Sequence, residues 1–95
     1  MKPRPILYIK SGCSWCREAR SFFSEQGIKV NVRDVYESAS AYQQMIAVSD
    51  QTMTPTFEYG DFVVSDFDVE EFVEKLDLRP DVQAELGLVL VDEDD

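Results

Sequence analysis

The chain of 95 residues contains two cysteines, and they form a Cys-x-x-Cys pair, Cys13-Ser14-Trp15-Cys16. Two thiols at this spacing can form and break a disulfide through thiolate attack and a mixed-disulfide intermediate. The pair follows a short apolar segment and opens a helical pattern, which places Cys13 at a helix N-terminus. Free N–H groups and the helix dipole stabilise a thiolate there. We therefore predict Cys13 as the nucleophile and Cys16, one turn further along, as the resolving thiol.

Basic residues gather around these thiols in a chain that is otherwise acidic. Lys10 precedes Cys13 by three residues, and Arg17 and Arg20 follow in the predicted helix. A nearby ammonium group lowers the pKa of a thiol, so Lys10 is expected to favour the thiolate. Half of a zinc site shared between two chains, or two inert buried thiols, are the alternative interpretations. A position between a buried strand and an amphipathic helix favours redox chemistry over both.

Pro55 is the second feature that points to chemistry. It ends a polar loop and begins a strand-like segment. A cis peptide bond before Pro55 would present the backbone N–H and C=O of Thr54 to an extended peptide, as one strand does to another. A trans proline at the first residue of a strand is the common alternative. The Cys-x-x-Cys pair about forty residues earlier leads us to expect the cis form.

The composition excludes several classes of function. There are 19 acidic residues against 9 basic ones, a net charge of -10, and no histidine. This charge argues against nucleic acid and anionic membranes as partners. The absence of histidine excludes His-based triads and His metal sites, and two cysteines are too few for an all-cysteine zinc site in one chain. With no apolar run of membrane-spanning length and no signal-peptide core, we expect a soluble cytoplasmic protein with reduced thiols.

Patterning predicts a β-α-β-α-β-β-α order. Strands are expected at 6–9, about 28–33, 56–59 and 62–65, and helices at 14–26, 38–48 and 69–76. Asp68 and Glu71 form a capping-box pattern before the third helix, and Gly60-Asp61 suits a hairpin turn. The first two strands should be parallel, because a helix connects them, and the last two antiparallel. The fold class is therefore α/β, with a four-stranded mixed sheet flanked by helices.

The C-terminal part differs in character. Pro80 cannot continue the third helix, so we divide the chain into a domain at 1–78 and a C-terminal extension at 79–95. One or two helical turns are expected at 81–86. An apolar stretch at 87–91 and an acidic tail at 92–95, which we expect to be solvated, complete the chain.

Together these features resemble the glutaredoxin family of the thioredoxin superfamily. The resemblance is carried by the segment 8–16, by Asp34-Val35, by Met53-Thr54-Pro55 and by the acidic start of the third helix. It implies a thioredoxin-like fold and thiol–disulfide exchange, with glutathione as co-substrate. The implied partners are disulfide-containing or glutathionylated proteins and a reductase system. No metal is expected, and the protein should act as a monomer.

The resemblance also implies roles for residues around the cysteines. Lys10 would contact a glutathione carboxylate, and Trp15 would flank the substrate groove. Thr54 would pair its backbone with the cysteinyl unit of glutathione. The remaining implied residues are the cis-proline Pro55 and, holding the γ-glutamyl end at the helix N-terminus, Phe67 and the Asp68 backbone N–H.

The chain departs from the family pattern at three places. Ser14-Trp15 replaces the usual Pro-Tyr between the cysteines, Met53-Thr54 replaces Thr-Val, and Ser65-Asp66 replaces a Gly-Gly pair. A carboxylate at position 66 would repel the γ-glutamyl carboxylate unless it points away or caps the helix.

Two related interpretations therefore stay open beside the first. Gly60-Asp61 and the 65–67 spacing are similar to NrdH-type redoxins, which thioredoxin reductase reduces. Ser14 in place of proline is similar to glutaredoxins that dimerise around a [2Fe–2S] cluster, with Cys13 and glutathione thiols as ligands. A redox-inert adaptor of the same fold is a further alternative.

Overall fold

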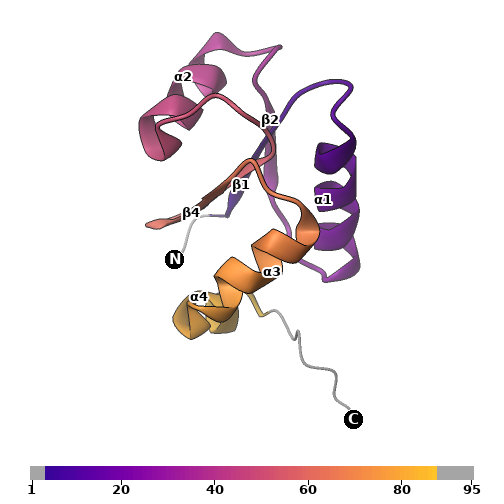
Figure 1. Cartoon of the computed structure of the whole chain (residues 1–95), viewed down its shortest axis with the longest axis vertical. Coiled ribbons are helices and arrows are strands. Elements are labelled where there is room, and N and C mark those ends of the chain that lie inside the picture. The colour runs from indigo at the N-terminus through magenta and orange to yellow at the C-terminus, as the bar shows by residue number, and fades with distance from the viewer. Residues whose placement is uncertain (1–3, 88–95) are drawn as a thin grey trace.

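A four-stranded mixed sheet with helices on both faces forms the centre of the computed structural model, which describes residues 4–87 (Figure 1). The expected apolar stretch at 87–91 and the acidic tail at 92–95 fall, apart from residue 87, outside the described residues. The elements follow in the order β1 (Ile6–Ile9), α1 (Ser14–Glu25), β2 (Asn31–Asp34), α2 (Ala39–Ser49), β3 (Thr56–Tyr59), β4 (Phe62–Ser65), α3 (Val69–Asp77) and α4 (Pro80–Leu86).

The strand order β2-β1-β3-β4 places β1 near the middle of the sheet. It pairs in parallel with β2 and antiparallel with β3, and β3 forms an antiparallel hairpin with β4. Leu7 and Ile9 face the core under α1 and α3, whereas Tyr8 faces the core under α2. Burial on both faces explains why β1 reads as an unbroken apolar run, and the predicted α/β class is confirmed.

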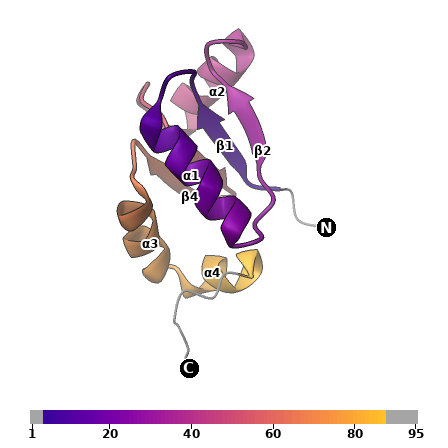
Figure 2. The same cartoon turned by 90° about the vertical axis from the view of Figure 1, so that its right-hand side faces the viewer.

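Two helices, α1 and α3, cover one face of the sheet, and α2 covers the other (Figures 1 and 2). An aromatic cluster fills the first core. The ring of Phe57 stacks on Phe23 at 5.2 Å between centroids and meets Phe72 edge-on at 4.9 Å. Such pairs add stabilisation beyond the area that they bury. They fix α1 against the sheet, and α1 carries both cysteines.

The second strand begins later than the sequence pattern predicts. The alternation suggested 28–33, but β2 covers Asn31–Asp34. The backbone N–H of Ile28 still bonds to the carbonyl of Phe23 at the end of α1, so this segment completes the helix terminus instead of joining the sheet. Pairing begins where the Asn31 N–H reaches the carbonyl of Pro5. Val32 then lies at the open edge of the sheet, 37% exposed.

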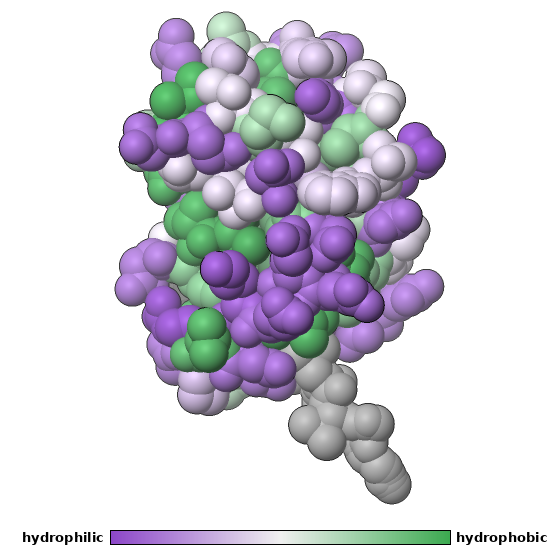
Figure 3. Space-filling view, in the orientation of Figure 1, coloured by the Kyte–Doolittle hydropathy of each residue, from purple (hydrophilic) through white to green (hydrophobic). Residues whose placement is uncertain are grey.

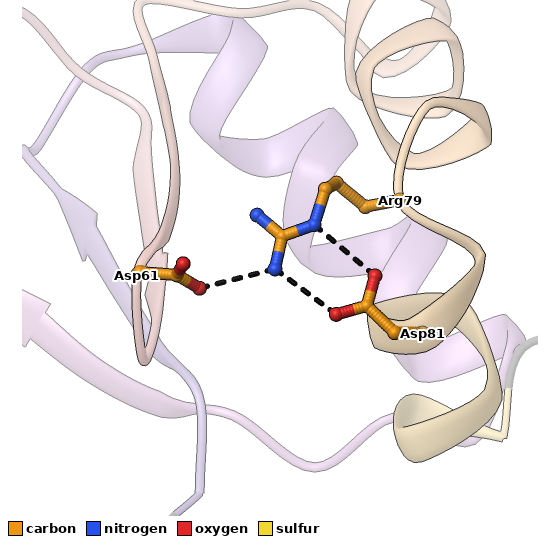
Figure 4. Close-up of polar contacts among 3 residues, drawn as sticks. All are labelled: Asp61, Arg79 and Asp81. Atoms are coloured by element: carbon orange, nitrogen blue, oxygen red, sulfur yellow. Dashed lines mark hydrogen bonds and ion pairs between the residues drawn. The ribbon is translucent and has the colours of Figure 1, made fainter.

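The last helix packs on the domain. Its Val82 is buried in the core beneath α1 and α3. At its start, Arg79 joins Asp61 of the β3–β4 turn to Asp81 with N–O distances of 3.1 and 3.0 Å (Figure 4). The pairs are exposed, so their contribution to stability is small, and burial of Val82 is the larger effect. None of the helices between residues 4 and 87 has the length and apolar character that a membrane span requires.

A pair of substitutions tests the docking of α4. Val82→Ala should lower the free energy of unfolding by about 1–2 kcal/mol, because it leaves a cavity in the core. Leu78→Ala removes more carbon atoms from the same part of the chain. It should nevertheless change the free energy of unfolding by less than about 0.5 kcal/mol, because Leu78 is 75% exposed. Urea denaturation measures both. A larger loss for Leu78→Ala than for Val82→Ala would contradict the packing described.

Candidate active site

The two cysteines lie where the end of β1 meets the start of α1. Cys13 is the N-cap residue of α1, and its Sγ accepts a hydrogen bond from the backbone N–H of Cys16 at 3.2 Å. The preceding Gly12 has a φ of +80°, a left-handed conformation that favours glycine and turns the chain from strand to helix. A sulfur thus occupies the place where helices usually carry a hydroxyl or carboxylate cap.

The loop before β3 brings a second group to this sulfur. The hydroxyl Oγ1 of Thr54 lies 3.8 Å from Cys13 Sγ, and the Thr54 carbonyl oxygen lies 3.9 Å from it. The peptide bond between Thr54 and Pro55 is cis, as expected. Both residues of this bond are buried. The fold therefore places the Cys-x-x-Cys pair and the Thr54–Pro55 loop side by side.

The surroundings favour a negative charge on one sulfur of the pair. Partial burial raises the pKa of Cys13, but other groups outweigh it and leave this pKa below its ordinary value. These groups are the thiol and N–H of Cys16, the hydroxyl of Thr54 and the positive charge of Lys10. Burial and the hydrogen bond to Cys13 raise the pKa of the buried Cys16 thiol. Cys13 is thus the more acidic of the two thiols and Cys16 the less acidic.

Exposed aromatic and apolar side chains lie on the segments that carry Cys13, Thr54 and the contact of Lys10. Trp15 is 42% exposed beside Cys13, in agreement with its expected place at the surface, and Met53 is similarly exposed next to Thr54. Tyr36, which no motif marked, is 70% exposed, and Lys10 Nζ lies 5.9 Å from the centre of its ring. A cation held over an aromatic face is mildly stabilised. Only the structure reveals this contact, because Tyr36 follows β2 and is distant in sequence from Lys10.

At the N-terminus of α3, the protein's own side chains already bond to backbone N–H groups, including the Asp68 N–H that the resemblance assigns to glutathione. The Asp68 backbone N–H donates to Glu71 Oε1 at 3.1 Å, and Asp68 Oδ1 accepts from the Glu71 N–H at 2.8 Å, so the capping box is confirmed. The ring of Phe67 is buried against Phe72, which leaves only its backbone for a ligand. Asp66 adopts a φ of +53°, and its N–H donates to the Pro55 carbonyl. Figure 3 shows hydrophilic side chains gathered over α3.

Cys13 is partly exposed, whereas Cys16 is buried. A hollow of about 370 Å³ is found elsewhere, between the C-terminal end of α1 and β2, and includes Arg20 and Val32 in its lining. Between residues 4 and 87, no three cysteine or acidic side chains gather as a group that could hold a metal ion. The Cys13 side chain is therefore not enclosed in the protein core.

Known proteins resemble this chain in a family sequence pattern and in fold. The family model described as Glutaredoxin matches residues 6–64. The fold is similar to the thioredoxin-like protein BC3987, with a TM-score of 0.69 at 22% identity, covering 76% of this chain and 99% of that one. It is also similar to a glutaredoxin from Archaeoglobus fulgidus, with a TM-score of 0.68 at 18% identity, covering 80% and 87% of the two chains.

A third solved structure covers nearly the whole chain. The glutaredoxin from Brucella melitensis has a TM-score of 0.63 at 19% identity, and the match covers 94% of this chain and 96% of that one. At these identities the solved structures show the fold alone. No curated protein sequence matches the chain significantly.

Alkylation by iodoacetamide tests the asymmetry between the thiols. Reactivity follows the thiolate and rises as the pH passes through the pKa of each thiol. In a Cys16→Ser variant, the remaining Cys13 should react with a midpoint below the value of about 8.5 for a free cysteine. In a Cys13→Ser variant, Cys16 should react only above it. Both variants in urea serve as the control and should share one midpoint. A lower midpoint for folded Cys16 than for folded Cys13 would reverse the assignment.

Proposed function

Because this chain belongs to the glutaredoxin family, we propose that it is a thiol–disulfide oxidoreductase that reduces protein disulfides or glutathione mixed disulfides through Cys13 and Cys16. One observation carries the proposal: Cys13 Sγ caps α1 and accepts the Cys16 N–H at 3.2 Å, while a second, buried thiol lies one turn away. The cap stabilises the attacking thiolate, and the second thiol completes the exchange.

The reaction balances over two sulfur exchanges. The Cys13 thiolate attacks one sulfur of the substrate disulfide, a new S–S bond forms, and the other substrate sulfur leaves as a thiolate that takes up a proton. Cys16 then loses its proton and attacks Cys13 Sγ, which releases the second substrate thiol. The substrate gains two electrons and two protons, and the enzyme keeps a Cys13–Cys16 disulfide. Two molecules of glutathione restore the dithiol and leave as glutathione disulfide.

The neighbouring residues suit a peptide-like substrate. The buried backbone of Thr54 would pair with the cysteinyl unit of glutathione or with an extended segment of a protein. The Lys10 ammonium would face a carboxylate, and Trp15 would form one wall of the groove. Pro55 would hold Thr54 at the sulfur, from which the Thr54 hydroxyl and carbonyl oxygens lie 3.8 and 3.9 Å away.

We propose glutathione as the reductant, with an affinity that the α3 N-terminus lowers. The γ-glutamyl carboxylate would have to displace Glu71 Oε1 from the Asp68 N–H or bind beside it. It would also meet the exposed Asp66, where the family pattern has glycine. The two negative charges would repel one another, which would weaken the binding of glutathione. Substrates without a carboxylate near Asp66 would not meet this repulsion.

A [2Fe–2S] cluster fits these residues poorly. Each of two chains would supply one Cys13 sulfur, and glutathione thiols would supply the other ligands. Glutathione would need the same α3 N-terminus, where Glu71 already accepts the Asp68 N–H. Visible absorbance after anaerobic purification would reopen this alternative.

Cysteine substitutions test the proposed function. Cys13→Ser should abolish the reduction of a protein disulfide, because the nucleophile is lost. Cys16→Ser should abolish it too but retain removal of glutathione from a glutathionylated protein, since glutathione can resolve that intermediate. The assay couples glutathione and glutathione reductase to NADPH oxidation. Full disulfide reduction by Cys13→Ser would overturn the proposal, and recycling by thioredoxin reductase alone would assign the protein to the NrdH-type group.

Asp66→Gly tests the effect of the α3 N-terminus on glutathione. Glycine suits the left-handed φ of +53° and removes the repelling charge. The KM for glutathione should fall roughly threefold, which corresponds to the interaction of surface charges. Asp50→Gly is a matched control, because Asp50 is also exposed and has a φ of +56°. An equal fall in both variants, or none in Asp66→Gly, would contradict the role given to Asp66.

A further inference from the structure

Gln51 lies half-buried in the loop between α2 and β3, and hydrogen bonds surround its side-chain amide. Its Nε2 is 2.8 Å from Ser49 Oγ, 3.0 Å from Thr56 Oγ1 and 3.3 Å from the Met53 carbonyl oxygen. Its Oε1 accepts the backbone N–H of Met53 at 2.7 Å. One side chain thus links the end of α2, the start of β3 and the residue before Thr54.

The donors and acceptors of this network match one another. The Ser49 hydroxyl donates to the Met45 carbonyl at 2.6 Å, and the Thr56 hydroxyl donates to the Met53 carbonyl at 2.8 Å. Each hydroxyl has then used its only hydrogen and can accept one from the two on Gln51 Nε2. The amide oxygen therefore has to face Met53. Only an amide supplies both the donors and the acceptor that this arrangement requires.

We propose that Gln51 is a positioning residue that fixes the Met53–Thr54 segment so that the Thr54 hydroxyl lies beside Cys13 Sγ. The backbone N–H and C=O of Met53 are both held by this network, and the Met53 carbonyl belongs to the peptide unit that leads into Thr54. Gln51 acts only through Thr54, because its partners lie in the loop and in the two flanking elements. The proposal rests on the proposed function, since it concerns the thiol that begins the exchange.

The effect on the thiol follows from the geometry. The Thr54 hydroxyl at 3.8 Å is one of the groups that lower the pKa of Cys13. If the loop moves, this donor leaves the sulfur, and less Cys13 is thiolate at a given pH. Hydrogen bonds to sulfur weaken steeply with distance and angle, so a shift of the loop by a fraction of an ångström suffices.

Two substitutions test Gln51, and both are close to it in size. Gln51→Glu keeps the acceptor for the Met53 N–H but places oxygen against two hydroxyls that have no free hydrogen. Gln51→Met removes every polar contact and adds no charge. In both variants, the rate at which iodoacetamide alkylates Cys13 at pH 6 should be lower than in the wild type by a factor of about three or more. This is the effect expected for the loss of a hydrogen bond to a charged group. Gln43→Glu and Gln43→Met, at an exposed position on α2, are the matched controls and should react as the wild type does.

A Thr54→Val background separates positioning from general destabilisation. If Gln51 acts through the Thr54 hydroxyl, Gln51→Met should slow alkylation much less in this background than in the wild type. Equal slowing in both backgrounds would overturn the proposal, as would slowing by Gln51→Glu alone, which charge would explain. A Gln51 variant that does not fold would assign the residue to stability and would overturn it too. A wild type in which Cys13 reacts with a midpoint no lower than the value of about 8.5 for a free cysteine would instead refute the proposed function.

Discussion

The hydrogen bond from the Cys16 N–H to Cys13 Sγ is the contact on which the site depends. It makes the sulfur the N-terminal cap of α1, so that the N–H groups at the helix N-terminus also stabilise a thiolate. The contact holds only if α1 begins at Ser14 and lies tightly on the sheet. Phe23, near the other end of α1, provides this packing by stacking on Phe57 and meeting Phe72 edge-on. Core aromatic residues and redox chemistry are therefore linked through a single helix.

Electrostatics distinguish two sides of this surface. Lys10 brings a positive charge to Cys13, in a chain whose net charge is -10. The N-terminus of α3, which could also attract anions, carries Asp66, Asp68 and Glu71 instead. The N–H groups of Asp68 and Glu71 donate to the protein's own carboxylates. The sulfur thus favours its own negative charge, whereas the neighbouring helix disfavours an additional one from a substrate.

The sequence allowed most of this arrangement to be predicted, because the signals are local. Short-range periodicity and capping patterns identified α3 and the β3–β4 hairpin, and Cys13 was expected at a helix start. The start of β2 was misplaced because alternation at Ile28 and Val30 also suits a chain that leaves a helix and packs on the core. The contacts of Lys10 with Tyr36 and of Gln51 with its loop could not be predicted. They depend on where separate segments meet, and no residue type or spacing marks them.

A redox titration of the Cys13–Cys16 pair tests whether the two thiols form one redox couple. The wild-type protein is equilibrated in buffers of defined glutathione and glutathione disulfide ratio, and free thiols are trapped by alkylation and counted by mass spectrometry. We expect one reversible two-electron transition in which both cysteines lose their thiols together. A pair that stays reduced across the series, or that forms only disulfides between chains, would contradict it and would favour a redox-inert protein of the same fold.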